Sequence, residues 1–311
     1  MTKEHINNLK DIDLSAKSGF VLTPYVKDIT SRCLVYLNAG FPVHLKGPAG
    51  TGKTMLALYI AQIIGKPSTV IFGNEDFNTE DMVGLEYGFR RKLLVDDYIH
   101  SVHKSVEDYE QKWMDGRIID ACENGYTLIY DEFTRSKPET NNILLSVLEE
   151  KVLELPVGYK ENNKLLKVHP EFKAIFTSNP EEYIGVYKSQ DALLDRLITI
   201  ELDFPDLESE VSIAKAKSGM NREKTEKIIA IVRKFREQHK SNFVVSLRDS
   251  IKICKVLEVG KISIDPNNST FRAICEDVLT SGIGIQKAKI HHIKLRDEIN
   301  SIINSVLKNQ G

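Results

Sequence analysis

No hydrophobic run in the sequence approaches the length of about 18 residues that a membrane-spanning helix needs. Residues 1–13 are polar and mixed in charge, so the N-terminus lacks the profile of a secretory signal peptide. Positive charge is not in excess either, because 42 Lys and Arg residues stand against 44 Asp and Glu residues, for a net charge of −2. This balance provides no overall basic surface for nucleic acid. We therefore expect neither a membrane span nor a nucleic-acid partner.

Cysteine is scarce and scattered. The four cysteines form no C-x-x-C pair and lie in apolar or helical stretches, so we expect reduced, packed thiols in a cytoplasmic protein; they are Cys33, Cys122, Cys254 and Cys275. The pairs His100/His103 and His291/His292 have no cysteine nearby and no evident third ligand, which indicates surface histidines rather than a zinc site. The remaining composition, 41% hydrophobic and 28% charged over 311 residues, is typical of one large or two ordinary globular domains.

One stretch stands out from this ordinary background. Residues 47–54 fit the pattern G-x-x-x-x-G-K-[ST], which wraps the phosphates of a nucleotide. Glycines let the backbone turn with positive φ and approach the phosphates, and consecutive N–H groups form a nest for the anion. Lys53 supplies a mobile positive charge for the β- and γ-phosphates, and the Thr54 hydroxyl is a ligand for Mg²⁺. The predicted phosphate-binding residues are Gly47, Pro48, Ala49, Gly50, Thr51, Gly52, Lys53 and Thr54.

The segments on both sides of this loop favour the nucleotide interpretation. Residues 42–46 have the pattern of a short strand, and residues 55–64 that of an apolar helix that ends at Gly65. Strand, glycine loop and helix is the order that phosphate binding requires. The alternative is a glycine turn between two core elements, with a solvated Lys53.

Two carboxylates follow a second apolar run. Residues 126–130 have the pattern of a strand buried on both faces, and the run ends in Asp131 and Glu132. Open α/β sheets place their ligands at the carboxyl ends of strands. We therefore predict that Asp131 holds Mg²⁺ beside Thr54 and that Glu132 orients the attacking water. A solvated acidic turn is the alternative.

An asparagine follows the next strand along the chain. Residues 172–177 are predicted to form this strand, and Asn179 comes just after it, before Pro180. An amide at this position can hydrogen-bond the attacking water or the γ-phosphate. By itself, asparagine before proline indicates only a turn.

The overall pattern predicts an α/β fold with a P-loop, a parallel five-stranded sheet flanked by helices, and a small all-helical lid domain after it. We expect an N-terminal arm over residues 1–20, a nucleotide-binding domain over 21–205 and the lid over 206–311. Residues 84–111 exceed a βαβ link and are predicted to be an insertion. Its aromatic and basic tip, which precedes a helical run, is a candidate contact loop; a surface decoration without a partner is the alternative. The other expected elements are a helix over 24–37, strands over 68–72 and 197–202, a helix over 139–150, a hairpin over 152–168, and helices over 226–239, 247–259, 270–279 and 283–307.

This arrangement resembles the AAA+ ATPases. Residues 179–185, Asn-Pro-Glu-Glu-Tyr-Ile-Gly, followed by residues 192–196, Ala-Leu-Leu-Asp-Arg, are similar to the MoxR branch of that family. Within the branch, the chain is similar over residues 20–203 to ATPases of gas vesicle formation. That similarity is specific at residues 41–45, 131–139, 141–150, 168–170 and 176–180.

The resemblance implies roles that the residues alone do not. Arg196 matches the arginine finger, which reaches a γ-phosphate held by a neighbouring subunit, and Arg248 matches the second sensor of the lid. A surface helix arginine is the alternative for Arg248. The resemblance also implies ATP and Mg²⁺ as ligands, a homo-oligomer in the form of a hexameric ring, and an insertion over residues 84–111 that can face the pore of the ring.

The implied function is Mg²⁺-dependent ATP hydrolysis in a factor that assembles or remodels gas vesicles, with shell or accessory vesicle proteins as partners and a cytoplasmic, vesicle-associated location. Two alternatives are a nucleotide-gated adaptor, which recruits vesicle proteins by binding alone, and a general MoxR-type chaperone that matures a partner protein. DNA unwinding is disfavoured by the slightly acidic charge. The predicted catalytic residues are Lys53, Glu132, Asn179, Arg196 and Arg248.

Overall fold

The computed structural model of the chain describes residues 20–95, 105–155, 165–179, 191–239, 245–281 and 288–308. The chain divides into two compact units. The sheet unit comprises Cys33–Lys46 and Ala57–Glu201, and the helical unit comprises Met1–Arg32, Gly47–Leu56 and Leu202–Gly311. The predicted arm, apart from Phe20, lies outside the described residues, as do His100, His103 and residues 180–190 of the MoxR-like motif.

The sheet unit is built on five parallel strands, which confirms the predicted fold class. The strand order is β2-β5-β8-β1-β9. All five residues of β5 and five of the six residues of β8 are buried, because helices cover both faces of a parallel sheet. The strands are β1 (Val43–Lys46), β2 (Ser68–Phe72), β5 (Thr127–Asp131), β8 (Lys173–Ser178) and β9 (Ile198–Glu201).

Helices α6 (Arg117–Asn124) and α8 (Ile143–Leu148) share one hydrophobic core with β2, β5 and β8. At its centre, the rings of Tyr130, Phe133 and Phe176 lie 5.4–6.1 Å apart between centroids, a range in which edge-on aromatic contacts are favourable. The helix predicted over 139–150 is instead two short helices, α7 (Pro138–Asn141) and α8, which meet at Asn142.

The remaining helices of this part of the chain are α3 (Pro24–Asn38), α4 (Lys53–Ile64), α5 (Thr79–Val83), the 3-10 helix η2 (Phe133–Arg135) and α9 (Asp191–Leu194). Helices α3 and α4 extend into both units.

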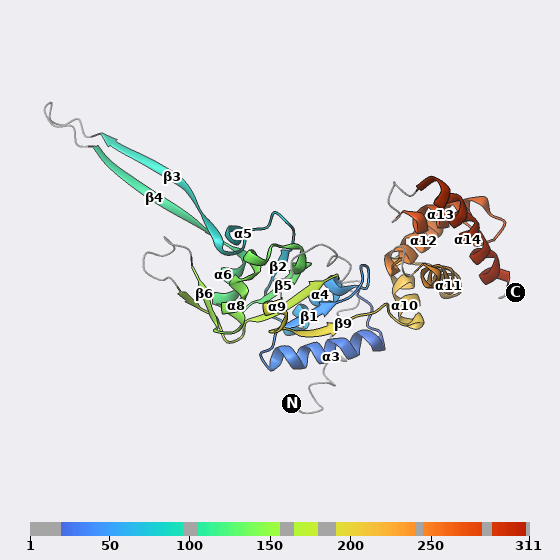
Figure 1. The fold of residues 1–311 in the computed structure, drawn as a ribbon, viewed down its shortest axis with the longest axis horizontal. Coiled ribbons are helices and arrows are strands. Elements are labelled where there is room, and N and C mark those ends of the chain that lie inside the picture. The colour runs from blue at the N-terminus through green and yellow to red at the C-terminus, as the bar shows by residue number, and fades with distance from the viewer. Residues whose placement is uncertain are drawn as a thin grey trace. The chain divides into compact units, whose positions relative to one another are not determined.

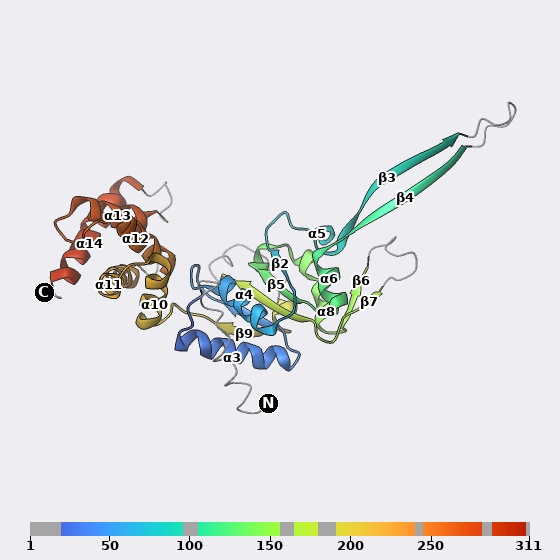
Figure 2. The same ribbon diagram turned by 180° about the vertical axis from the view of Figure 1, so that it is seen from behind.

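Residues 84–95 and 105–115 form a two-stranded ribbon, so the helical run predicted within residues 84–111 is wrong for the described residues. Strands β3 (Gly84–Val95) and β4 (Ser105–Asp115) pair antiparallel, and the pairing begins at Gly84 and Asp115. The ribbon leaves the sheet unit beside α5 and α6 (Figures 1 and 2). The charged sequence of β4 indicated a helix, but pairing with β3 satisfies the backbone groups that a helix would satisfy internally. A shorter antiparallel pair, β6 (Val152–Glu154) and β7 (Leu165–Lys167), confirms the hairpin predicted over 152–168.

The helical unit contains the predicted C-terminal helices and one that the pattern missed. Helix α10 (Leu207–Ser218) buries Ser209 and Glu210 alongside Val211 and Ala214, so its inward face lacks the apolar periodicity by which helices are predicted. The others are α11 (Arg222–Gln238), α12 (Leu247–Val259), α13 (Ser269–Thr280) and α14 (Ala288–Lys308). All five helices contribute side chains to one hydrophobic core.

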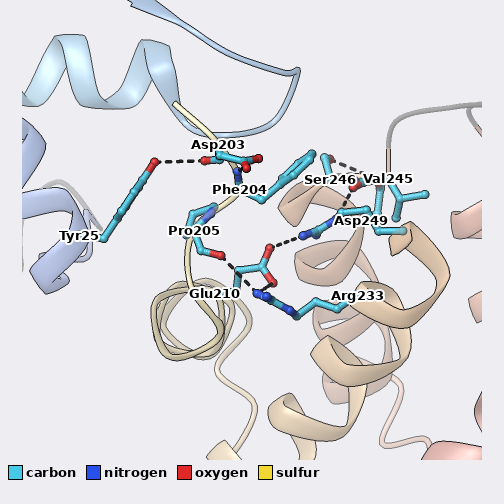
Figure 3. A network of polar contacts seen from close by, with 10 residues as sticks. Tyr25, Asp203, Phe204, Pro205, Glu210, Arg233, Val245, Ser246 and Asp249 are labelled. Atoms are coloured by element: carbon cyan, nitrogen blue, oxygen red, sulfur yellow. Dashed lines mark hydrogen bonds and ion pairs between the residues drawn. The ribbon is translucent and has the colours of Figure 1, made fainter. Parts of the chain in front are cut away.

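A buried polar network joins α10, α11 and the segment just before α12 (Figure 3). The fully buried Glu210 carboxylate accepts from Arg236 Nη1 at 2.7 Å and from Arg233 Nη1 at 3.1 Å. Arg236 Nε donates to the Val245 carbonyl at 2.7 Å, and its guanidinium carbon lies 4.1 Å from the ring centroid of Phe204, a cation–π contact. The cation–π contact holds Phe204 against the helices. Removing one partner of the ion pairs would leave an uncompensated buried charge, so we expect such a change to destabilise this unit.

All four cysteines are buried thiols without a disulfide, which confirms the prediction of packed thiols. Burial raises the pKa of Cys122, Cys254 and Cys275 to about 12, so these groups are poor nucleophiles at neutral pH. Among the described helices, none combines the length and the apolar character that crossing a membrane demands.

Candidate active site

Three adjacent strands end at the edge of the sheet where parallel folds bind their ligands. Strand β1 leads directly into the loop Gly47–Thr54, β5 ends at Asp131, and Asn179 follows the end of β8. In the register of the sheet, Lys46 pairs with Ser178, and Tyr130 pairs with Phe176. The carboxyl ends of β1, β5 and β8 therefore lie level with one another.

Two glycines give the backbone of the loop a conformation that a side chain would strain. Gly50 and Gly52 have φ values of +79° and +90°, which only glycine adopts without strain. A Cβ atom on Gly47 would lie 2.3 Å from the Leu202 carbonyl oxygen, so a side chain there is excluded. Lys53 is buried and begins α4, and its Nζ donates to the carbonyl oxygens of Gly47 at 2.7 Å and Pro48 at 2.8 Å. The loop therefore lies at the positive N-terminal end of a 12-residue helix.

The end of β5 holds its two carboxylates in different environments. Asp131 is 6% exposed, and its Oδ1 accepts from the Thr177 hydroxyl at 2.5 Å. The Glu132 side chain is 43% exposed and forms an ion pair with Arg135, with 2.7 Å between Oε2 and Nη1. Glu132 also has φ +53° and ψ +40°, a left-handed conformation that is uncommon for a residue with a side chain.

Sequence reasoning missed the residues that support this turn. The Thr177 hydroxyl accepts from the Glu132 N–H at 3.0 Å, and the Gly73 N–H donates to the Asp131 carbonyl at 2.8 Å. A Cβ atom on Gly73 would lie 2.2 Å from the Glu132 carbonyl oxygen. The signals for these residues were present but weak: a glycine directly after β2, and a hydroxyl within the apolar run of β8.

Asn179 is 9% exposed, next to a second group of buried polar contacts. The fully buried His44 ring in β1 contacts Ser178 Oγ through Nε2 at 2.7 Å and Thr199 Oγ1 through Nδ1 at 3.0 Å. These bonds join β9, β1 and β8 at the residue that precedes Asn179.

The structure does not bring Arg196 to the same edge. Arg196 precedes β9, so it lies at the amino edge of the sheet, where its Nε donates to the Glu149 carboxylate at 2.7 Å and its Nη1 to the Ala192 carbonyl at 2.5 Å. Arg248 is exposed on the second residue of α12 in the helical unit. In that unit, a Cβ atom on Gly50 would lie 2.4 Å from Ser246 Cβ, so the glycine allows the loop to approach the residue before α12.

The sheet topology and the loop after β1 define a P-loop nucleotide-binding domain of the AAA class. A family model for the AAA domain of the dynein-related subfamily matches residues 42–197. The gas vesicle ATPase GvpN of Ancylobacter aquaticus is 46% identical over 267 residues, which cover 86% of this chain and 74% of that protein. GvpN of Haloferax mediterranei is 39% identical over 308 residues, 98% of this chain and 86% of that protein. GvpN1 of Halobacterium salinarum is 39% identical over 293 residues, 93% and 81% of the two proteins.

The chain therefore belongs to the GvpN family of gas vesicle ATPases, within the AAA domains. Membership makes it an ATP-binding protein and an ATPase.

Proposed function

We propose that this protein hydrolyses ATP with Mg²⁺ as a homo-oligomeric ring and uses the reaction to assemble or remodel the proteins of gas vesicles. The observation that carries the proposal is the division of the predicted residues between two edges of one sheet. The loop Gly47–Thr54, Asp131 and Asn179 follow the carboxyl ends of adjacent strands, whereas Arg196 precedes β9 at the amino edge.

The residues at the carboxyl edge suit the binding and hydrolysis of a nucleoside triphosphate. The loop N–H groups bind phosphate oxygens, and the Lys53 ammonium exchanges the carbonyls of Gly47 and Pro48 for the β- and γ-phosphates. Glu132 orients the attacking water, and the Asn179 amide hydrogen-bonds the water or the γ-phosphate. These groups act by position and charge, which is how phosphoryl transfer is catalysed.

The donor set at this edge also suits Mg²⁺. The Thr54 hydroxyl and the Asp131 carboxylate are oxygen ligands of the kind that Mg²⁺ prefers, so these two residues would hold the ion. Bound Mg²⁺ would neutralise the negative charge that develops on the phosphate oxygens during the reaction.

The position of Arg196 favours an assembly of several copies. The edges of the sheet are separated by strands of four to six residues, roughly 13–20 Å at about 3.3 Å per residue, which disfavours a role for Arg196 at the carboxyl edge of its own sheet. An arginine at the amino edge can instead serve the nucleotide of a neighbouring copy, in the manner of an arginine finger. Arg248 would contact the nucleotide from the lid.

The ATPase rate per subunit, measured against protein concentration, tests this proposal. We expect a very weak rate for the isolated subunit and a steep rise as copies associate, because an arginine finger contributes about 10³- to 10⁵-fold in rate. Added shell or accessory proteins of gas vesicles are expected to raise the rate further. A rate per subunit that stays constant across the concentrations where light scattering detects assembly would exclude a site shared between copies.

A further inference from the structure

The Thr177 side chain links the two carboxylates of the candidate active site. Thr177 lies in β8 and is fully buried, and its neighbour in the sheet is β5, which ends at Asp131. Its hydroxyl donates its single proton to Asp131 Oδ1 at 2.5 Å and accepts the N–H of Glu132 at 3.0 Å. One hydroxyl therefore fixes the side chain of the first residue and the backbone of the second.

The backbone of Glu132 needs such support because its conformation is strained. A left-handed conformation is unfavourable for a residue with a side chain, because Cβ comes too close to the following carbonyl oxygen. The Glu132 peptide is held from both neighbouring strands, by Thr177 on β8 and, on the side of β2, by Gly73, which leaves room for the Glu132 carbonyl. Strain of this kind persists where the surrounding structure fixes it, and it is concentrated at functional sites.

The side chain type at position 177 is not explained by packing alone. Valine has nearly the same shape as threonine and favours strands at least as strongly, so an apolar β8 has no need of a hydroxyl. The hydroxyl does matter to Asp131, whose buried carboxylate requires donors. It also holds that carboxylate in one orientation, and a metal ligand needs a fixed orientation.

We propose that Thr177 is a positioning residue for ATP hydrolysis, which sets the orientation of the Asp131 carboxylate toward Mg²⁺ and the left-handed turn that places Glu132. The inference rests on the proposed function, because it takes Asp131 as the metal ligand and Glu132 as the residue that orients water. A purely structural hydroxyl would affect stability without any specific effect on turnover or on the metal.

The substitution Thr177→Val removes the hydroxyl and keeps the shape. We expect ATP affinity to stay unchanged and kcat to fall about 10- to 100-fold, because a shift of a catalytic group by about 1 Å costs about 10²-fold. Mn²⁺ binding in the presence of a non-hydrolysable ATP analogue, followed by electron paramagnetic resonance, is expected to weaken about tenfold or more. Thr177→Ser retains the hydroxyl and should restore both quantities.

Thr127→Val provides the matched control, since Thr127 is a buried threonine at the opposite end of β5. It is expected to leave kcat and Mn²⁺ affinity at the wild-type values. Equal kcat and Mn²⁺ affinity in Thr177→Val and wild type would overturn the proposal, even if the melting temperature fell, and so would an equal loss in Thr127→Val. If Thr177→Val fails to fold, Thr177→Cys, which keeps the volume with a weak donor, takes its place.

The two readouts separate this inference from the proposed function. If the wild type binds Mn²⁺ and the analogue but does not hydrolyse ATP, the proposed hydrolytic function fails, and the Mn²⁺ affinity of Thr177→Val still decides the role of Thr177. If the wild type binds no Mn²⁺ with the analogue, both proposals are overturned.

Discussion

Arg196→Ala is expected to lower ATP turnover by about 10³- to 10⁵-fold in the assembled protein while leaving ATP binding intact. The physical reason is the position of Arg196 at the amino edge of the sheet, opposite the carboxyl edge at which Asp131 ends β5. Its guanidinium is held by the Glu149 carboxylate and the Ala192 carbonyl, so it is presented in a fixed place at the surface of the sheet unit. Turnover at saturating ATP, with nucleotide affinity measured separately, checks this expectation.

Arg222→Ala is the matched control, because Arg222 is an exposed arginine that pairs with Glu208 and Glu226 in the helical unit. It should leave turnover unchanged. Mixing Arg196→Ala with a Lys53→Ala variant should restore part of the activity, since one copy then supplies the arginine and the other the nucleotide. Full turnover by Arg196→Ala alone would remove this residue from the site.

Glu132→Gln is expected to reduce turnover by about 10²- to 10⁴-fold and to trap bound ATP, because the amide cannot accept a proton from the attacking water. The phosphate-binding loop and Asp131 are unaltered by this change, so the affinity for ATP should be retained. Single-turnover hydrolysis and the ratio of bound ATP to ADP after incubation measure the two effects. The control is Glu139→Gln, an exposed glutamate on α7, which should behave as wild type.

The same variant separates the proposed remodelling enzyme from a nucleotide-gated adaptor. Cells that carry Glu132→Gln in place of the natural protein should form no gas vesicles if hydrolysis drives assembly. An adaptor would still support vesicles, because it needs nucleotide binding alone. A variant that hydrolyses ATP at the full rate would show that Glu132 has no role in the chemistry.

The sheet and the loop were predictable because each depends on local sequence. The strand over residues 68–72 is found at β2, and the run that ends at Asp131 is β5, since a fully buried parallel strand is a continuous apolar stretch. The left-handed conformation of Gly52 follows from a pattern that requires glycine at this position. In such segments, local preference and tertiary structure favour the same conformation.

The features that escaped prediction depend on contacts between distant residues. Strand β4 is set by pairing with β3, and its charged sequence alone indicated a helix. Helix α10 buries Glu210, and the burial of this charge is tolerated because Arg233 and Arg236 of α11 form ion pairs with it. The roles of Thr177 and Gly73 arise from their places beside the end of β5. Contacts between residues that are distant in the sequence leave no local sequence pattern from which they could be predicted.

The central claim, that the loop after β1 and the carboxylate at the end of β5 act on one Mg²⁺-bound ATP, is tested most directly by isothermal titration calorimetry. We expect wild-type protein to bind ATP more tightly with Mg²⁺ than without it. Lys53→Ala should abolish binding, and Asp131→Asn should bind ATP but lose the gain from Mg²⁺. The absence of any binding heat for wild type with Mg²⁺ and ATP would contradict the claim, as would a full Mg²⁺ effect in Asp131→Asn.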